Sequence, residues 1–206
     1  MFGWLAYVWL GPGQSAYRFQ LIEEGGIAKF GNLGLDAWPD LVISKHEVRV
    51  EGVDQSLALA YLARRGNAPP VMLNWENQSG EPVVFLDVKL SEVTALATAI
   101  TKHVPKDAAV LAWWDTSRQI HLLTGQETVF NSHLGEPRIT PSIWRDKSEA
   151  IEKYEREFWK APASAEESRK FKRFADALVA DPKEGAAMLR ELAGGREAYV
   201  AVHLSD

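Results

Sequence analysis

The chain has 206 residues, of which 46% are hydrophobic and 25% are charged, and its formal net charge is −5. A chain of this length fits one domain with an appended subdomain, and it buries about 70% of its unfolded surface without needing a disulfide or a metal. Because there is no cysteine, disulfides, thiolate metal sites, iron–sulfur clusters, cysteine nucleophiles and covalent c-type haem attachment are excluded. No basic patch is interleaved with aromatic residues, so nucleic acid is not an expected partner.

Residues 1–10 form an apolar segment that is followed by Gly-Pro-Gly. A segment this short cannot cross a bilayer, which takes about 20 residues. Three interpretations stay open: the outer end of a transmembrane anchor whose start was trimmed, an N-terminal core strand, or an interfacial membrane segment. Trp4, Tyr7 and Trp9 suit the membrane–water boundary. We therefore expect residues 1–40 to be an anchor remnant with an irregular lead-in.

The stretch over 41–90 predicts a small β unit. HEVRVEG alternates apolar and charged residues, as a half-buried strand does. Residues 56–65 also alternate, and a strand is favoured there although alanine and leucine suit helix too. Residues 71–77 and 83–90 flank a turn-forming stretch, which predicts a β-hairpin.

After residue 90 the pattern changes to helices that alternate with short strands. A helix capped by Ser91 is predicted to residue 103, and the continuous apolar run at 108–114 predicts a strand buried on both faces. A short helix that Gly125 closes and a short strand at 127–130 follow.

Three more helices and a final strand complete the predicted elements, at 142–159, 164–180, 182–193 and 198–204. The second helix is expected to turn Phe171, Phe174, Leu178 and Val179 inward, and Asp181 is expected to cap the third. The alternation predicts an α/β unit with a parallel sheet over 91–206, which makes the whole chain α+β. Since the chain ends just after a buried strand, we expect this unit to be truncated at its C-terminus or closed by the β unit.

The best candidate site follows the strand at 108–114, because ligands of open α/β sheets bind beyond the carboxyl ends of the strands. Asp115 lies at such an end, and Arg118 could pair with an anionic ligand one turn later. His133 follows the next strand and is expected to approach Asp115 if the two strands are neighbours. The candidate ligand site, with or without a metal, comprises Trp114, Asp115, Arg118, His121, His133 and Glu136.

Plain structural roles compete with this site. Aspartate at a strand–helix junction is most often an N-cap, which contributes about 1 kcal/mol. His121 lies beside apolar residues and is more often a satisfied structural histidine, and His203 with Asp206 is a weaker candidate. No G-x-S-x-G, P-loop, dinucleotide fingerprint or H-E-x-x-H is present, so no catalytic residue is assigned.

Blocks from both halves of the chain carry a family resemblance. They are YVWLGPGQSAYRFQLIEEG, PPVMLNWENQSGEPVVFLDVKL, AITKHVPKDAAVLAWWDTSRQIHLLTGQETVF, SHLGEP and AAMLRELAGGREAYVAVHLSD. Together they resemble the hydroxylamine oxidation accessory protein HaoB family along essentially the whole chain. The resemblance implies a periplasm-facing envelope protein of ammonia oxidation (nitrification), anchored to the inner membrane at its N-terminus. It also implies the octahaem hydroxylamine oxidoreductase or related cytochromes as partners, no cofactor of its own and no catalytic residues to carry over.

Residues 91–206 are also loosely similar to the extracytoplasmic α/β domains of membrane glycosyltransferases, which implies the fold and an outward-facing location but no such active site. Three functions compete. A non-enzymatic accessory protein is the leading hypothesis. The alternatives are a small-ligand or metal-binding sensor or enzyme that uses Asp115, Arg118 and His133, and a structural module of an envelope complex.

Overall fold

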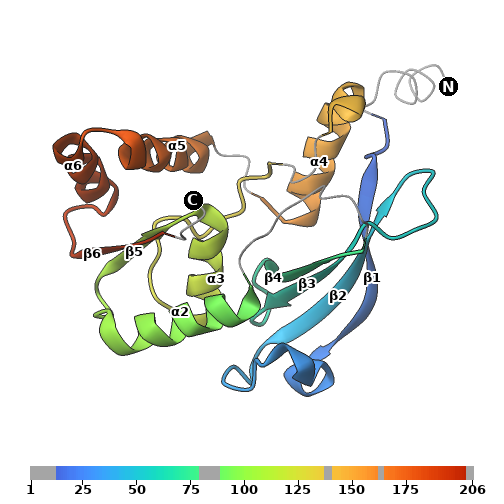
Figure 1. Ribbon diagram of the computed structural model, residues 1–206, viewed down its shortest axis with the longest axis horizontal. Helices are drawn as coiled ribbons and strands as arrows, with labels where there is room; N and C mark the ends of the chain where they lie inside the picture. Colours follow the sequence, from blue (N-terminus) through green and yellow to red (C-terminus); the bar gives the residue numbers. More distant parts are fainter. Residues whose placement is uncertain (1–12, 79–88, 137–140, 162–164, 203–206) are drawn as a thin grey trace.

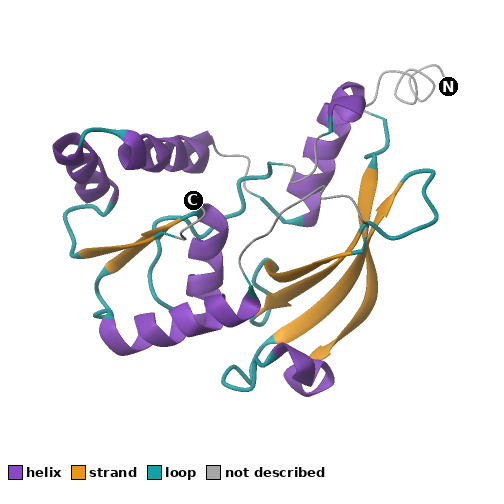
Figure 2. Ribbon diagram, in the orientation of Figure 1, coloured by secondary structure: helices purple, strands orange, loops and turns teal. Residues whose placement is uncertain are grey.

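The computed structural model describes residues 13–78, 89–136, 141–161 and 165–202. The predicted anchor at 1–10, most of the second hairpin strand, and the pair His203 and Asp206 lie outside these residues. The described chain forms a four-stranded antiparallel sheet and a two-stranded parallel sheet with helices around both (Figure 1; Figure 2). The predicted mixed α/β fold class is therefore confirmed.

The four-stranded sheet is a meander in the order β1-β2-β3-β4, and every neighbouring pair is antiparallel. Its strands are β1 (Tyr17–Gly26), β2 (Val42–Val50), β3 (Ala58–Arg64) and β4 (Val71–Asn77). The strands predicted near 41–51, 56–65 and 71–77 are confirmed.

The interpretation of residues 11–40 as irregular is wrong for β1. This strand buries Tyr17 and Phe19 near its start, whereas most of its other side chains are exposed or half-buried. Its far half pairs with β2 through the backbone, and a shift in register falls between Leu21 and Glu23. The first half of β1 does alternate, with Tyr17, Phe19 and Leu21 between polar residues, but the second half ends in Glu-Glu-Gly-Gly, which is more typical of a loop. The 3-10 helix η1 (Ile27–Leu33) then leads toward β2.

Each face of the four-stranded sheet is covered by helices from later in the chain. On one face, Ile43, Tyr61 and Leu73 pack in one core with residues of α2 (Leu90–His103) and α3 (Trp114–Thr124). On the other face, Phe19, Val48 and Leu62 pack against α4 (Ser148–Phe158) and Trp159. The 3-10 helix η2 (Ser142–Lys147) forms the first part of the helix predicted over 142–159.

The parallel sheet joins β5 (Ala109–Ala112) to β6 (Ala198–Ala201), as predicted. The strand predicted over 127–130 is reduced to one parallel bridge between Val110 and Thr128. Leu111 packs in a core with side chains of α5 (Ala165–Val179) and α6 (Pro182–Leu192), whereas Val110 packs with Ile100 and Ile120 of α2 and α3. β5 is therefore buried on both faces, as its continuous apolar run predicts.

The pair α2 and α3 contributes to the core of both sheets and lies between them (Figure 1). Side-chain hydrogen bonds fix α3 to the four-stranded half. The side chains of Arg65 (Nε) and Trp38 (Nε1) donate to the carbonyls of Leu122 and Leu123, each at 2.7 Å, and Gln119 Nε2 donates to the Met72 carbonyl at 2.9 Å. The hydrophobic core thus crosses the boundary predicted between residues 90 and 91.

Two predictions about helix ends are confirmed and one is wrong. Gly125 closes α3 in a left-handed conformation, and Asp181 accepts from the Lys183 amide at 3.0 Å to cap α6, both as predicted. The cap predicted at Ser91 is wrong, since the N-cap of α2 is Lys89.

The inward face predicted for α5 is partly wrong. Phe174 is buried, but Leu178 is 38% exposed and Val179 is 87% exposed. The reason is that α5 is covered where α6 crosses it: Gly185 of α6 comes so close to the Ala177 carbonyl that a side chain there would clash, and Val179 lies at the helix end.

No helix among the described residues has the length and apolar character needed to cross a membrane.

Candidate functional site

Arg118 is the charged residue of the predicted site that the structure buries most completely. It lies on α3, directly after β5, and is only 3% exposed. Its Nη2 donates to the Pro70 carbonyl at 2.6 Å. The guanidinium carbon lies 6.0 Å from the Trp114 ring centroid and 5.8 Å from that of Trp159. Two indole rings and a backbone acceptor therefore fix the cation, and cation–π attraction is strongest in such a desolvated setting.

His133 completes the same cluster. It is 3% exposed, and its ring stacks on Trp159 with centroids 4.7 Å apart and meets Trp114 edge-on at 4.6 Å. Its Nδ1 accepts from the Gly135 amide at 2.9 Å. Because Nδ1 is the acceptor, the neutral ring carries its proton on Nε2.

Gly135 allows the loop after residue 130 to press against the end of α4. Its φ is +75°, and a Cβ built there would lie 2.7 Å from Arg156 Cγ and 3.3 Å from Ala161 Cβ. Any side chain would be strained and would push the loop outward. The orientation of His133 therefore depends on this glycine.

Behind Trp159 lies a buried carboxylate. Glu155 is fully buried and accepts hydrogen bonds from the Trp159 indole nitrogen and the Tyr17 hydroxyl. One residue earlier, the Tyr154 hydroxyl accepts from the Phe19 amide at 2.7 Å, and burial raises the pKa of Tyr154. The Trp159 ring thus joins β1 and α4 on one side to Arg118 and His133 on the other.

A pocket of about 180 Å³ opens at this cluster, between α3, the β3–β4 connection, the loop after residue 130 and the end of α4. Its polar and aromatic lining comprises Arg118, His121, Asn131, Ser132, His133, Trp159 and Lys160. Among the described residues that line it, none is an aspartate or glutamate. Its lining therefore favours anions or neutral acceptors over cations.

The structure brings part of the predicted site together. Arg118, His121 and His133 line one pocket, and Trp114 contacts two of them. Asp115 and Glu136 are not among the lining residues. In the part of the chain that the structure describes, no group of three or more His, Asp or Glu side chains could hold a metal ion. Ligand binding by the six residues remains a prediction.

Of the structural roles proposed for Asp115 and His121, the structure agrees with the second only. Asp115 is not the cap of α3, because Trp113 occupies that position; instead it lies in the first turn, where a negative charge favours the helix dipole. His121 Nδ1 lies 2.9 Å from the Gln126 carbonyl, which agrees with a satisfied structural histidine.

Trp159 and Lys160 also line this pocket, although neither was among the predicted site residues. Trp159 is fully buried, and Lys160 has φ +51°, so it is the one non-glycine residue with positive φ in the described ranges. Trp159 is the last residue of the helix predicted over 142–159, and this position was its only signal. Nothing in the local sequence shows that Lys160 takes a conformation that usually needs glycine.

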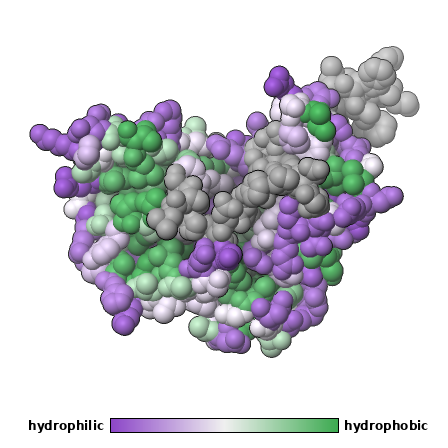
Figure 3. Space-filling view, in the orientation of Figure 1, coloured by the Kyte–Doolittle hydropathy of each residue, from purple (hydrophilic) through white to green (hydrophobic). Residues whose placement is uncertain are grey.

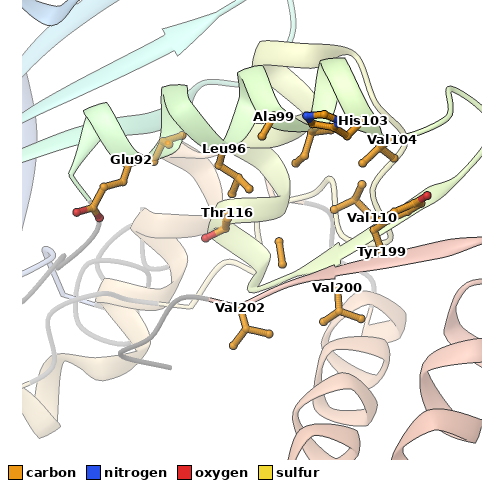
Figure 4. A pocket seen from close by; sticks show the side chains of 13 residues that line it. Glu92, Leu96, Ala99, His103, Val104, Val110, Thr116, Tyr199, Val200 and Val202 are labelled. Carbon is orange, nitrogen blue, oxygen red and sulfur yellow. The ribbon is translucent and has the colours of Figure 1, made fainter.

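A second hollow, of about 490 Å³, lies between α2 and β6. Its lining is mostly apolar and includes Leu96, Val104 and Tyr199, and Figure 4 shows Glu92 and His103 at opposite ends of the α2 side. We call this hollow the β6 groove. Tyr199 and Val200 of the strand are 36% and 42% exposed, and no further strand among the described residues pairs with β6.

Comparison with known proteins identifies one family. The family model described as HaoA-associated protein HaoB matches residues 1–206. No curated protein and no solved structure matches the chain.

Proposed function

Because this chain belongs to the family of the HaoA-associated protein HaoB, we propose that it binds HaoA, the hydroxylamine oxidoreductase, directly. The family implies an accessory role associated with HaoA in hydroxylamine oxidation. The match along residues 1–206 is the observation that carries the proposal, since it covers both sheets and every described helix. Direct binding is the simplest physical form of such an association.

The β6 groove supports a protein partner. Tyr199, Val200 and Val202 expose apolar surface beside a strand edge that is unpaired in the described part of the chain. Figure 3 shows apolar atoms gathered over the part of the molecule where Figure 1 places β6, α5 and α6. A partner can add a strand to such an edge and place its apolar side chains in the neighbouring groove. We therefore place the HaoA contact on this surface.

The experiment is size-exclusion chromatography with light scattering on purified chain and HaoA, at two salt concentrations. The wild-type chain is expected to form a stable complex at both salt concentrations, because an apolar contact is screened little by ions. No complex at tens of micromolar would show that direct binding is wrong.

A matched pair of variants locates the contact. Val200→Glu places a charge on the β6 groove and is expected to weaken binding about tenfold or more, because it buries an unpaired charge. Val53→Glu makes the same change at a site 50% exposed in the β2–β3 connection. It should leave binding unchanged, and equal binding by both variants would move the contact away from β6.

The cellular location forms the second part of the proposal: residues 1–10 associate with the inner membrane and the described body faces the periplasm. Trp4, Tyr7 and Trp9 support this, since such residues suit the membrane interface. Protease treatment of spheroplasts should digest the body without lysis. Protection until lysis would overturn the orientation, and full release into the soluble fraction would overturn the tether.

A small-ligand sensor or enzyme is the second candidate. The observation that favours it is that Arg118, His121 and His133 line one pocket.

A further inference from the structure

We infer that the pocket at Arg118 binds a small oxyanion, such as a carboxylate or a phosphate. This inference goes beyond the accessory role and does not depend on HaoA. Its basis is the charge of the lining side chains. Arg118, Lys160 and two histidines line a pocket to which the described chain contributes no carboxylate. The whole chain has a net charge of −5, so the pocket differs in sign from the protein around it.

The pocket also has a size that suits such a ligand. Its volume of about 180 Å³ equals roughly six water molecules, since each occupies about 30 Å³ in the liquid. A carboxylate or phosphate group fits in this space and still leaves room for water. Asn131 and Ser132 add neutral polar groups to the lining, and these can donate to an oxyanion beside the two cations.

Arg118 is held in place before any ligand arrives. Burial of an arginine is costly unless its surroundings compensate, and two indole rings and the Pro70 carbonyl are among the groups that do so here. A guanidinium fixed in this way loses little conformational freedom when an oxyanion binds, which favours affinity. Its planar fork matches the oxygen spacing of carboxylate and phosphate.

Lys160 supplies the second, independent observation. Where α4 ends, the Ala161 amide donates to the Arg156 carbonyl at 2.9 Å and the Lys160 amide donates to the Glu157 carbonyl at 3.3 Å. This is the helix ending that places glycine, or sometimes asparagine, in the left-handed position. A lysine occupies it instead, with φ +51°, and lines the pocket. The chain therefore places a cation at the pocket where glycine would be more stable.

This conflict between stability and charge gives a sharp test. Lys160→Asn removes the charge and keeps a residue that tolerates positive φ, whereas Lys106→Asn removes a charge in an exposed turn outside the pocket. The probes are sodium acetate and sodium phosphate, compared with sodium chloride at equal ionic strength. Binding is measured by titration calorimetry and by the shift in melting temperature.

The wild-type chain and Lys106→Asn are expected to bind acetate or phosphate with equal affinity. Lys160→Asn should weaken binding about two- to fivefold, the range of an exposed charge pair, while its melting temperature without anion stays equal or rises. Arg118→Lys should weaken binding about tenfold or more, because the fork is lost. A chain stabilised no more by acetate and phosphate than by chloride would overturn the inference, and so would equal anion affinity in wild type and Lys160→Asn. Neither result bears on HaoA binding.

Discussion

The two sheets of this protein differ in how completely they are covered. In the four-stranded sheet, Ala58 and Ala60 are fully buried, and helices from residues 90–159 close both faces. In the parallel sheet, β5 is buried, but β6 exposes Tyr199 and Val200 along an edge with which no other described strand pairs. The difference is one of coverage: the first sheet is enclosed by helices, whereas the second leaves apolar side chains of β6 exposed.

The largest expected effect is a loss of stability when the buried link between β1 and the helix that covers the four-stranded sheet is removed. Glu155→Ala removes the acceptor of two buried donors, on Tyr17 and Trp159. We expect a loss of about 3 kcal/mol or more in the free energy of unfolding, because both donors stay buried and lose this acceptor. Urea denaturation measures it, and Glu152→Ala on the exposed face of α4 is the control. Equal midpoints for the two variants would contradict the role of this carboxylate.

A smaller effect is expected where α5 and α6 meet. Gly185→Ala places a methyl group against the Ala177 carbonyl, and overpacking of this kind costs about 1–3 kcal/mol. Hydrogen exchange should show faster exchange in α5, α6 and β6, with β1 to β4 unchanged. Gly31→Ala, which has open space around its Cβ position, should leave both halves unchanged. Equal acceleration in all strands would show that the two sheets unfold as one unit.

The smallest effect concerns pH. His46 of β2 is buried and meets Phe158 edge-on, and burial lowers its pKa below the usual 6.5. The unfolded chain therefore takes up a proton first. The contribution of His46 is complete above pH 6.5 and is lost as the pH falls toward the lowered pKa, with a slope of at most about 1.4 kcal/mol per pH unit.

Urea titrations between pH 7 and pH 5 measure this slope. His46→Gln should lessen the loss of stability at low pH, whereas His103→Gln at an exposed position should not. A wild-type slope that His46→Gln leaves intact would assign the pH dependence to other groups.

The sequence predicted those elements that carry a clear local pattern, such as apolar alternation, an unbroken apolar run or a helix cap. The alternation around Val48 gave β2, the unbroken apolar run gave β5, and Asp181 with Pro182 gave the start of α6. β1 was missed because its apolar alternation covers only Tyr17, Phe19 and Leu21, and the strand ends in charged residues and glycine. The exposure of β6 was missed because an apolar pattern shows which residues tend to be buried, not whether another element covers them.

The candidate site was predictable in part for a similar reason. The position of Arg118 and His133 after consecutive buried segments was enough to group them. The residue that joins them, Trp159, comes from a helix on the far side of the four-stranded sheet. Its contribution depends on tertiary packing, which no local pattern records. The family resemblance, which rests on longer blocks, is confirmed along the whole chain.

The hydrogen bond between Tyr17 and Glu155 joins residues 138 positions apart in the chain. During synthesis the four strands are complete at residue 77, but the helix that covers Phe19, Val48 and Leu62 is still to be made. At about 5–20 residues per second, this apolar face stays bare for several seconds. The nascent chain therefore passes through an aggregation-prone stage, and a holdase that protects it until α4 emerges should raise the yield of folded protein.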